Sequence, residues 1–187
     1  MIAAQAHPIV VLIGPPGAGK SAVGPLLAER LGLEFRDTDA DVAATAGKPV
    51  SDIFIENGED AFRELEREAV TSALGEKSTL HSQGGVIALG SGAVLDDGVQ
   101  HMLDGLPVVY LSVSFAAVVR RMGLDRPRVV VPGNPRGRLR AMLETRVPVY
   151  QRLAAVTVET DDLEPDELAE QIAAAIAQQA DDQEVTP

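Results

Sequence analysis

A glycine-rich stretch near the amino terminus carries the clearest chemistry in this sequence. Residues 14–21 read GPPGAGKS, which fits the pattern of Gly, any four residues, Gly, Lys and then Ser or Thr. Backbone amides of such a loop, and of the helix that it opens, point at phosphate oxygens. Lys20, solvated without ligand, is expected to reach the β- and γ-phosphates, and the Ser21 hydroxyl to take one position around Mg²⁺. The stretch predicts a phosphate loop that binds nucleotide.

Two carboxylates one residue apart follow the second expected strand. Asp37 and Asp39 come directly after residues 34–36, at the end of a strand where open α/β sheets bind their ligands. One carboxylate would hold Mg²⁺ while the other faces a substrate hydroxyl. The competing interpretation is a helix N-cap, since Asp and Thr are favoured there. The phosphate loop nearby favours the functional interpretation.

Apolar runs alternate with helical periodicity along the chain, and this pattern predicts what positions these residues. Residues 8–13 form a β-branched run just before the phosphate loop, as a buried parallel strand does. Strands are expected at residues 8–13, 34–36, 86–89, 107–112 and 156–158. The alternation predicts an α/β fold, a three-layer sandwich with a five-stranded parallel sheet of the P-loop kinase type.

The segments between the strands carry their own expectations. Two short helices are expected between residues 40 and 58, separated at Gly47-Lys48-Pro49. Residues 75–85 are polar and predict a surface loop. Residues 123–137 are rich in glycine, proline and arginine without periodicity, which predicts a long functional loop, a mobile lid.

Two prolines mark expected helix boundaries in the last third of the chain. The helix after the long loop is expected to stop at Pro148. Pro165 is expected to open the last helix, because proline is favoured in the first turn.

The composition limits the classes of function. A length of 187 residues suits one α/β domain, and the absence of cysteine excludes disulfides and thiol catalysis. No apolar run approaches the roughly 20 residues of a membrane span, and no signal peptide is recognisable, so a cytoplasmic protein is expected. The net charge of −12 argues against a nucleic-acid surface. Nine arginines between residues 120 and 152, beside two acidic residues, suit a small anion such as ATP.

Taken together, these motifs resemble the shikimate kinase family over about residues 8–178. The shared features are the phosphate loop, Asp37-Thr38-Asp39, Asp52-Ile53-Phe54, Phe62-Arg63 followed by Glu66, Leu89-Gly90-Ser91-Gly92-Ala93-Val94, Arg126-Pro127, and Arg146 before Pro148 and Tyr150. The order and spacing of these features carry the resemblance, because no single one is decisive.

The resemblance implies a reaction and an organisation of the chain. The reaction is ATP-dependent phosphorylation of the 3-hydroxyl of shikimate, a step towards chorismate and the aromatic amino acids. ATP and shikimate are the expected partners, one Mg²⁺ per active site the expected cofactor, and a monomer without nucleic-acid or membrane partners the expected state. One domain is expected over residues 1–178, with a substrate-binding subdomain at about 39–70, the lid at about 123–137 and an acidic flexible tail at 179–187.

The resemblance also implies a role for individual residues. Asp37 would lie behind Ser21 in the outer shell of the metal, and Asp39 would hold the attacking hydroxyl. The residues expected to bind ATP are Gly14, Gly17, Ala18, Gly19, Lys20, Ser21, Ala22, Arg121 (near the adenine) and Arg126 (on the lid). The residues expected to bind shikimate are Asp39, Arg63, Gly90, Ser91, Gly92 and Arg146, with the two arginines on its carboxylate. The expected catalytic residues are Lys20, Asp39 and Arg126.

The sequence departs from the family pattern at three places. Ser91 stands in the middle of a glycine triplet, which raises the question of whether that backbone needs a positive φ. We expect serine to be tolerated, because its backbone N–H is the group that meets the substrate. Arg128-Val129-Val130-Val131 replaces the usual leucines after Arg126-Pro127, and the loop at 75–85 is longer than typical.

Two other functions stay open at this point. One is another small-molecule kinase on the same scaffold, such as a gluconate kinase, because paired arginines favour a carboxylate substrate without excluding a sugar acid. The other is a nucleotide-binding regulator that has lost catalysis. The presence of Lys20, Ser21, Asp37 and Asp39 weighs against the regulator.

Overall fold

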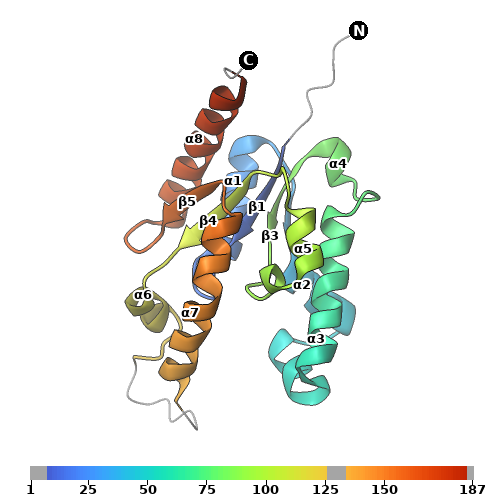
Figure 1. Cartoon of the computed structure of the whole chain (residues 1–187), viewed down its shortest axis with the longest axis vertical. Coiled ribbons are helices and arrows are strands. Elements are labelled where there is room, and N and C mark those ends of the chain that lie inside the picture. Colours follow the sequence, from blue (N-terminus) through green and yellow to red (C-terminus); the bar gives the residue numbers. More distant parts are fainter. Residues whose placement is uncertain (1–7, 126–133, 185–187) are drawn as a thin grey trace.

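Helices and strands alternate along the chain in the computed structural model, which describes residues 8–125 and 134–184, with side chains up to residue 179. Figure 1 shows the arrangement of these elements. The strands are β1 (Ile9–Ile13), β2 (Phe35–Asp37), β3 (Gly85–Ala88), β4 (Val108–Ser112) and β5 (Val156–Glu159). The helices are α1 (Lys20–Leu31), α2 (Thr38–Ala46), α3 (Val50–Leu74), α4 (Leu80–Gln83), the 3-10 turn η1 (Ala93–Leu95), α5 (Asp97–Met102), α6 (Phe115–Arg121), α7 (Pro135–Leu153) and α8 (Pro165–Glu184).

The five strands form one parallel sheet in the order β2-β3-β1-β4-β5. The central strand β1 is buried along its whole length, as its apolar, β-branched sequence predicted. Because all strands are parallel, their carboxyl ends meet at one edge of the sheet. The phosphate loop, Asp37 and the Gly90–Gly92 turn therefore come together there, although they lie far apart in the sequence.

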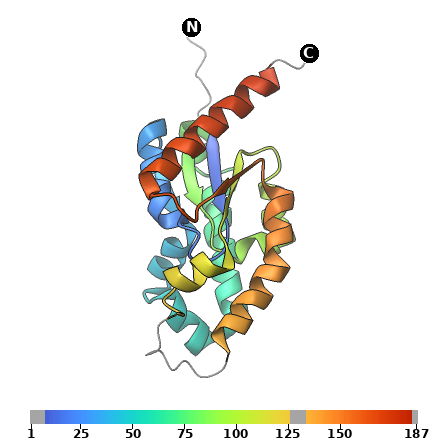
Figure 2. The same ribbon diagram turned by 90° about the vertical axis from the view of Figure 1, so that its left-hand side faces the viewer.

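Helices cover both faces of the sheet, and the two faces take alternate residues of β1. Val10 and Leu12 pack with side chains of α1 and α8 on one face. Val11 and Ile13 pack with side chains of α3, α5 and α7 on the other. Figure 2 shows α1 on one side of the strands and α7 on the other, with α8 starting beside α1 and crossing the view above the strands. The predicted three-layer α/β sandwich is confirmed.

Helices α2 and α3 form a pair with a small apolar cluster of its own around Ile53 and Phe62. The break between them lies where the sequence predicted it, since Gly47 ends α2 with a positive φ of 66°. A second glycine, Gly58, interrupts α3 with a φ of 84°. The first part of α3 therefore turns away from the long part that packs on the sheet.

Two predictions about the helices are wrong. The helix expected to stop at Pro148 continues to Leu153, because the proline lies on the exposed face while Tyr150, one turn from Arg146, is fully buried. The segment 75–85 is not only a surface loop: it contains α4, whose Leu80 is buried in the core. Helix α8 extends to Glu184 and so includes part of the segment from residue 179 that is predicted to be a flexible tail, which stays a prediction.

The predicted lid at 123–137 is described only in part. Helix α7 already begins at Pro135, where Asn134 caps it by accepting a hydrogen bond from the Gly137 N–H at 2.8 Å. Residues 126–133, and with them Arg126, lie outside the described residues. Within residues 8–125 and 134–184, none of the helices has the length and apolar character needed to cross a membrane.

Candidate active site

The phosphate loop joins β1 to α1 in a conformation that depends on glycine. Gly17 has a φ of 77°, and Gly19, which precedes the first turn of α1, has a φ of 96°. Within the described residues, the amides of Gly17, Gly19, Lys20 and Ser21 donate no hydrogen bond to the protein. The loop therefore presents several free N–H groups at a helix amino terminus, which is a site for an anion.

Lys20 lies inside this loop rather than in solvent. The residue is only 9% exposed, and its Nζ donates hydrogen bonds to the carbonyl oxygens of Gly14 at 2.7 Å and Pro15 at 3.3 Å. The expectation of a solvated lysine was wrong, because the loop's own carbonyls take the place of water. Burial lowers the pKa of Lys20 to about 8, and the nearby charges of Asp39 and Asp37 oppose that shift.

Asp37 caps α2, as one of the two interpretations predicted, and it also bonds to the phosphate loop. Its Oδ1 accepts a hydrogen bond from the Asp39 N–H at 2.9 Å, so it caps α2. Its Oδ2 accepts a hydrogen bond from the Ser21 hydroxyl at 2.6 Å. The Asp37 carboxylate thus ties the start of α1 to the start of α2, and it holds the hydroxyl expected beside Mg²⁺.

The turn after β3 meets the remaining predicted residues. A Cβ added at Gly90 would lie 2.5 Å from Asp39 Oδ1, and one added at Gly92 would lie 2.6 Å from the Arg63 Cζ. Between them, Ser91 accepts a hydrogen bond from Arg146 Nη1 at 3.2 Å on its side-chain oxygen. Three consecutive residues of one turn therefore touch three side chains predicted to bind the substrate.

Hydrogen bonds inside the protein fix most polar backbone groups of this turn. The Gly90 N–H donates to the hydroxyl of Thr38, which is fully buried, at 2.9 Å. The Ser91 carbonyl accepts a hydrogen bond from the Tyr150 hydroxyl at 2.6 Å. The amides of Ser91 and Gly92 donate to no acceptor among the described residues. Of the predicted backbone contacts, these two N–H groups are the ones available to a ligand.

The charged side chains of the site differ in whether a side chain of opposite charge is bonded to them. Arg63 bonds to Glu66, which is buried, and forms a longer ion pair with Glu59 at 3.3 Å. Burial raises the pKa of Glu66, and the bonded Arg63 opposes that shift. Burial also raises the pKa of Asp39, followed by the charge of Asp37, while Lys20 and Arg63 oppose it. Asp39 is thereby a better proton acceptor than an exposed carboxylate.

A hollow of about 420 Å³ adjoins the phosphate loop on the side of α8. Its lining includes the predicted ATP residues Gly17, Ala18, Gly19, Ala22 and Arg121, together with Val23, Thr160, Asp161, Asp162, Leu163, Glu164, Pro165 and Leu168. Arg121 Nη1 donates to the Gly17 carbonyl and to the Thr160 hydroxyl, each at 3.0 Å. The guanidinium thus joins the phosphate loop to the segment after β5.

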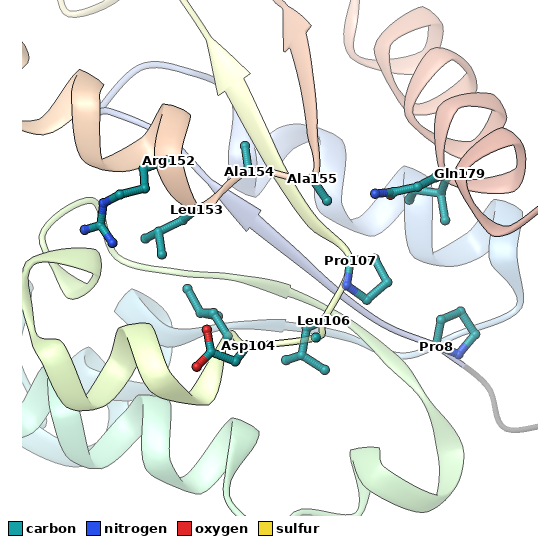
Figure 3. Close-up of a pocket in the computed structure, with 12 residues that line it drawn as sticks. Pro8, Asp104, Leu106, Pro107, Arg152, Leu153, Ala154, Ala155 and Gln179 are labelled. Atoms are coloured by element: carbon teal, nitrogen blue, oxygen red, sulfur yellow. The ribbon is translucent and has the colours of Figure 1, made fainter. Parts of the chain in front are cut away.

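A second hollow, of about 510 Å³, lies at the opposite edge of the sheet. Figure 3 shows Pro8, Pro107 and Ala155, which precede β1, β4 and β5, around it. None of the residues predicted to do chemistry lines this hollow. Ligands of open parallel sheets bind at the carboxyl ends of the strands, so the site is at the other edge.

Several residues of the site had no role assigned from the sequence. Thr38 and Tyr150 fix the turn after β3, and Glu66 holds Arg63. Glu66 and Tyr150 are members of the motifs, but the motifs alone do not show what they touch. One feature of the sequence could have identified the segment 160–165 as part of the site, because this segment follows the fifth strand at the ligand edge of the sheet.

The fold and the site define a P-loop kinase of a small molecule. The family model for shikimate kinase matches residues 16–177. A shikimate kinase from Thermobifida fusca is 53% identical over 169 residues, which are 90% of this chain and 95% of the relative. One from Salinispora arenicola is 52% identical, over 91% of this chain and 98% of the relative. This chain belongs to the shikimate kinase family, so its activity is that of a kinase with ATP as co-substrate.

Solved structures agree with this assignment. The shikimate kinase from Acinetobacter baumannii in complex with shikimate has a TM-score of 0.80 and 32% identity, and the match covers 92% of this chain and 94% of that chain. A gluconokinase from Sinorhizobium meliloti reaches a TM-score of 0.53 at 19% identity. At that identity the likeness is one of fold alone. The gluconate-type alternative therefore has no support beyond the shared scaffold.

Proposed function

We propose that this protein transfers the γ-phosphoryl group of ATP to the 3-hydroxyl of shikimate. One observation carries the proposal: the turn Gly90-Ser91-Gly92 touches Asp39, Arg146 and Arg63 at successive residues. Arg63 and Arg146 would bind the carboxylate of a substrate, and Asp39 would bind one of its hydroxyl groups. The arrangement therefore fits a substrate that carries both a carboxylate and hydroxyl groups. In the solved complex, the A. baumannii shikimate kinase is bound to shikimate.

The nucleotide would lie across the phosphate loop. Its phosphates would take the free amides between Gly17 and Ser21, and Lys20 would exchange the carbonyls of Gly14 and Pro15 for phosphate oxygens. The adenosine would enter the hollow beside Arg121. Exchange of one set of acceptors for another lets Lys20 stay buried before and after ATP binds.

Ser21 and Asp37 fit a magnesium ion, because hydroxyl and carboxylate oxygens are the ligands that Mg²⁺ prefers. Among the described residues, no group of three or more His, Cys, Asp or Glu side chains could hold a metal ion. Mg²⁺ held there would supply positive charge that offsets the negative charge developing during phosphoryl transfer. The protein's share would be to hold the Ser21 oxygen through Asp37.

The substrate would lie between Arg63, Arg146 and Asp39. Its carboxylate would meet the two guanidiniums and the free amides of Ser91 and Gly92. Its 3-hydroxyl would face Asp39, whose pKa is raised by burial and by the charge of Asp37. Asp39 would direct the hydroxyl and accept its proton as the phosphoryl group leaves ATP.

The remaining expectations stay predictions. Arg126, proposed to bridge substrate and phosphate, lies outside the described residues. We infer a monomer that works in the cytoplasm, with a substrate-binding subdomain at about 39–70 and a lid at about 123–137.

A coupled ADP-release assay tests the proposed function. The purified protein is supplied with ATP and Mg²⁺ and with shikimate, gluconate or a nucleoside monophosphate in turn. We expect ADP only with shikimate. ADP release with gluconate alone, or tight ATP binding with no turnover of any of these compounds, would contradict the proposal.

A further inference from the structure

The side chain of Ser91 has a partner that the sequence did not reveal. Its Oγ accepts a hydrogen bond from Arg146 Nη1 at 3.2 Å. The serine also causes no backbone strain, because no residue other than glycine has a positive φ in the described part of the chain. The Ser91 side chain therefore makes a contact within the site and does not strain the turn.

Arg146 depends on this hydroxyl more than Arg63 depends on any one partner. Arg63 is held by two carboxylates, those of Glu59 and Glu66. Among the described residues, Arg146 has no carboxylate within 4.0 Å, and the one hydrogen bond of normal geometry that it donates goes to the Ser91 hydroxyl; the Tyr150 hydroxyl also lies close enough to the guanidinium for Arg146 to oppose the rise that burial causes in the Tyr150 pKa. A long arginine side chain without a fixed partner keeps several rotamers, whose loss costs free energy when a ligand binds.

Ser91 is itself held in place by the same helix that carries Arg146. The Tyr150 hydroxyl donates to the Ser91 carbonyl at 2.6 Å, and Tyr150 is fully buried and stacks on Tyr110 with 5.3 Å between ring centroids. Arg146 and Tyr150 are four residues apart on α7, so they project from the same face of the helix. Two side chains on this face of α7 therefore donate hydrogen bonds to Ser91, one to its carbonyl oxygen and one to its hydroxyl oxygen.

We propose that the Ser91 hydroxyl positions Arg146 for the carboxylate of the substrate. A neutral partner orients the guanidinium without cancelling its charge, so the full charge stays available to a carboxylate. Orientation before binding reduces the entropy lost when the complex forms. Ser91 is thus a positioning residue that strengthens substrate binding, whereas a glycine at this place would leave Arg146 without this support. The inference rests on the proposed function, because it takes shikimate as the ligand.

Steady-state kinetics of Ser91→Ala test the proposal. This change removes the hydroxyl and keeps the Cβ, so the turn retains its shape. We expect KM for shikimate to rise about three- to tenfold, as loss of one hydrogen bond to a charged, partly buried group implies. The values of kcat and of KM for ATP should change less than twofold. Ser91→Thr, which restores a hydroxyl, should return KM towards the wild-type value.

A double-mutant cycle separates positioning from a general effect on the turn. In the Arg146→Ala background, Ser91→Ala should change kcat/KM less than twofold, because the side chain that Ser91 orients is gone. Ser82→Ala is a matched control, since Ser82 lies on the exposed side of α4 and its hydroxyl donates to the carbonyl of Thr79, which precedes that helix, so the change should leave all constants unchanged.

Two results would overturn the inference while the proposed function stands. One is a wild-type protein that phosphorylates shikimate, with an unchanged KM for Ser91→Ala. The other is an equal loss from Ser91→Ala with and without the Arg146 side chain, which would point to damage of the turn. A wild-type protein that does not phosphorylate shikimate would instead contradict the proposed function itself.

Discussion

Raising the pH through 8 should weaken ATP binding, because Lys20 loses its proton in the free protein. Burial lowers its pKa to about 8, whereas the phosphates of bound ATP favour the charged form. A phosphate monoester has a second pKa of about 6, so the terminal phosphate of ATP is expected to be largely ionised in this range. Among the described residues of the phosphate loop, Lys20 is therefore the group whose charge changes between about pH 7.5 and 9, and affinity should fall as the pH rises.

The pKa of Lys20 sets the size of this effect. At pH 9, one unit above a pKa of about 8, about one protein in ten keeps the proton on Lys20. If ATP binds to the protonated form, the dissociation constant should rise about tenfold between pH 7 and pH 9, which is about 1.4 kcal/mol. About half of the molecules are protonated at pH 8, so a twofold rise should be seen there.

Isothermal titration calorimetry with a non-hydrolysable ATP analogue and Mg²⁺ measures this dependence. Lys20→Arg is the control, because arginine stays charged over the whole range and should give a flat profile. A wild-type dissociation constant that stays constant from pH 7 to pH 9 would refute the reasoning. An equal rise in Lys20→Arg would assign the effect to some other group.

Three further changes test other parts of the site. Asp39→Asn should lower kcat with shikimate by roughly 10²- to 10⁴-fold and leave ATP affinity unchanged. Asp37→Asn should instead alter the Mg²⁺ dependence of kcat. The reverse pattern would mean that the two carboxylates have exchanged roles. Gly92→Ala should raise KM for shikimate about tenfold or more, because its Cβ would lie 2.6 Å from the Arg63 Cζ; a normal KM would show that Arg63 can move away. Tyr150→Phe should lower the free energy of unfolding in urea by about 1–3 kcal/mol, because the Ser91 carbonyl loses its donor; unchanged stability would mean that water replaces the hydroxyl.

Local sequence patterns were sufficient to predict most strands of the sheet and the phosphate loop. The β-branched run before Gly14 is buried as β1, and the glycines of the loop have the positive φ values that the motif requires. The predicted end of the helix at Pro148 was wrong because the effect of a proline depends on which face of the helix it occupies. Here it is exposed, and water can bond to the carbonyl that its missing N–H would have used.

Contacts between distant residues were beyond the reach of local patterns. Thr38 meets Gly90 across 52 positions, and Tyr150 meets Ser91 across 59 positions. No spacing rule connects such pairs, because the sheet topology alone brings them together. The motifs therefore identified Ser91 and Tyr150 as members of the site without revealing the contact between them.

The position of the transferred phosphate tests the central claim most directly. The product made from ATP and shikimate is isolated and its phosphorus–proton couplings are measured by NMR. We predict a single phosphorylated product whose phosphorus couples to the proton on carbon 3, the carbon that bears the hydroxyl facing Asp39. Coupling to a proton at another carbon, or recovery of shikimate without phosphate, would contradict the proposed placement of the substrate between Asp39, Arg63 and Arg146.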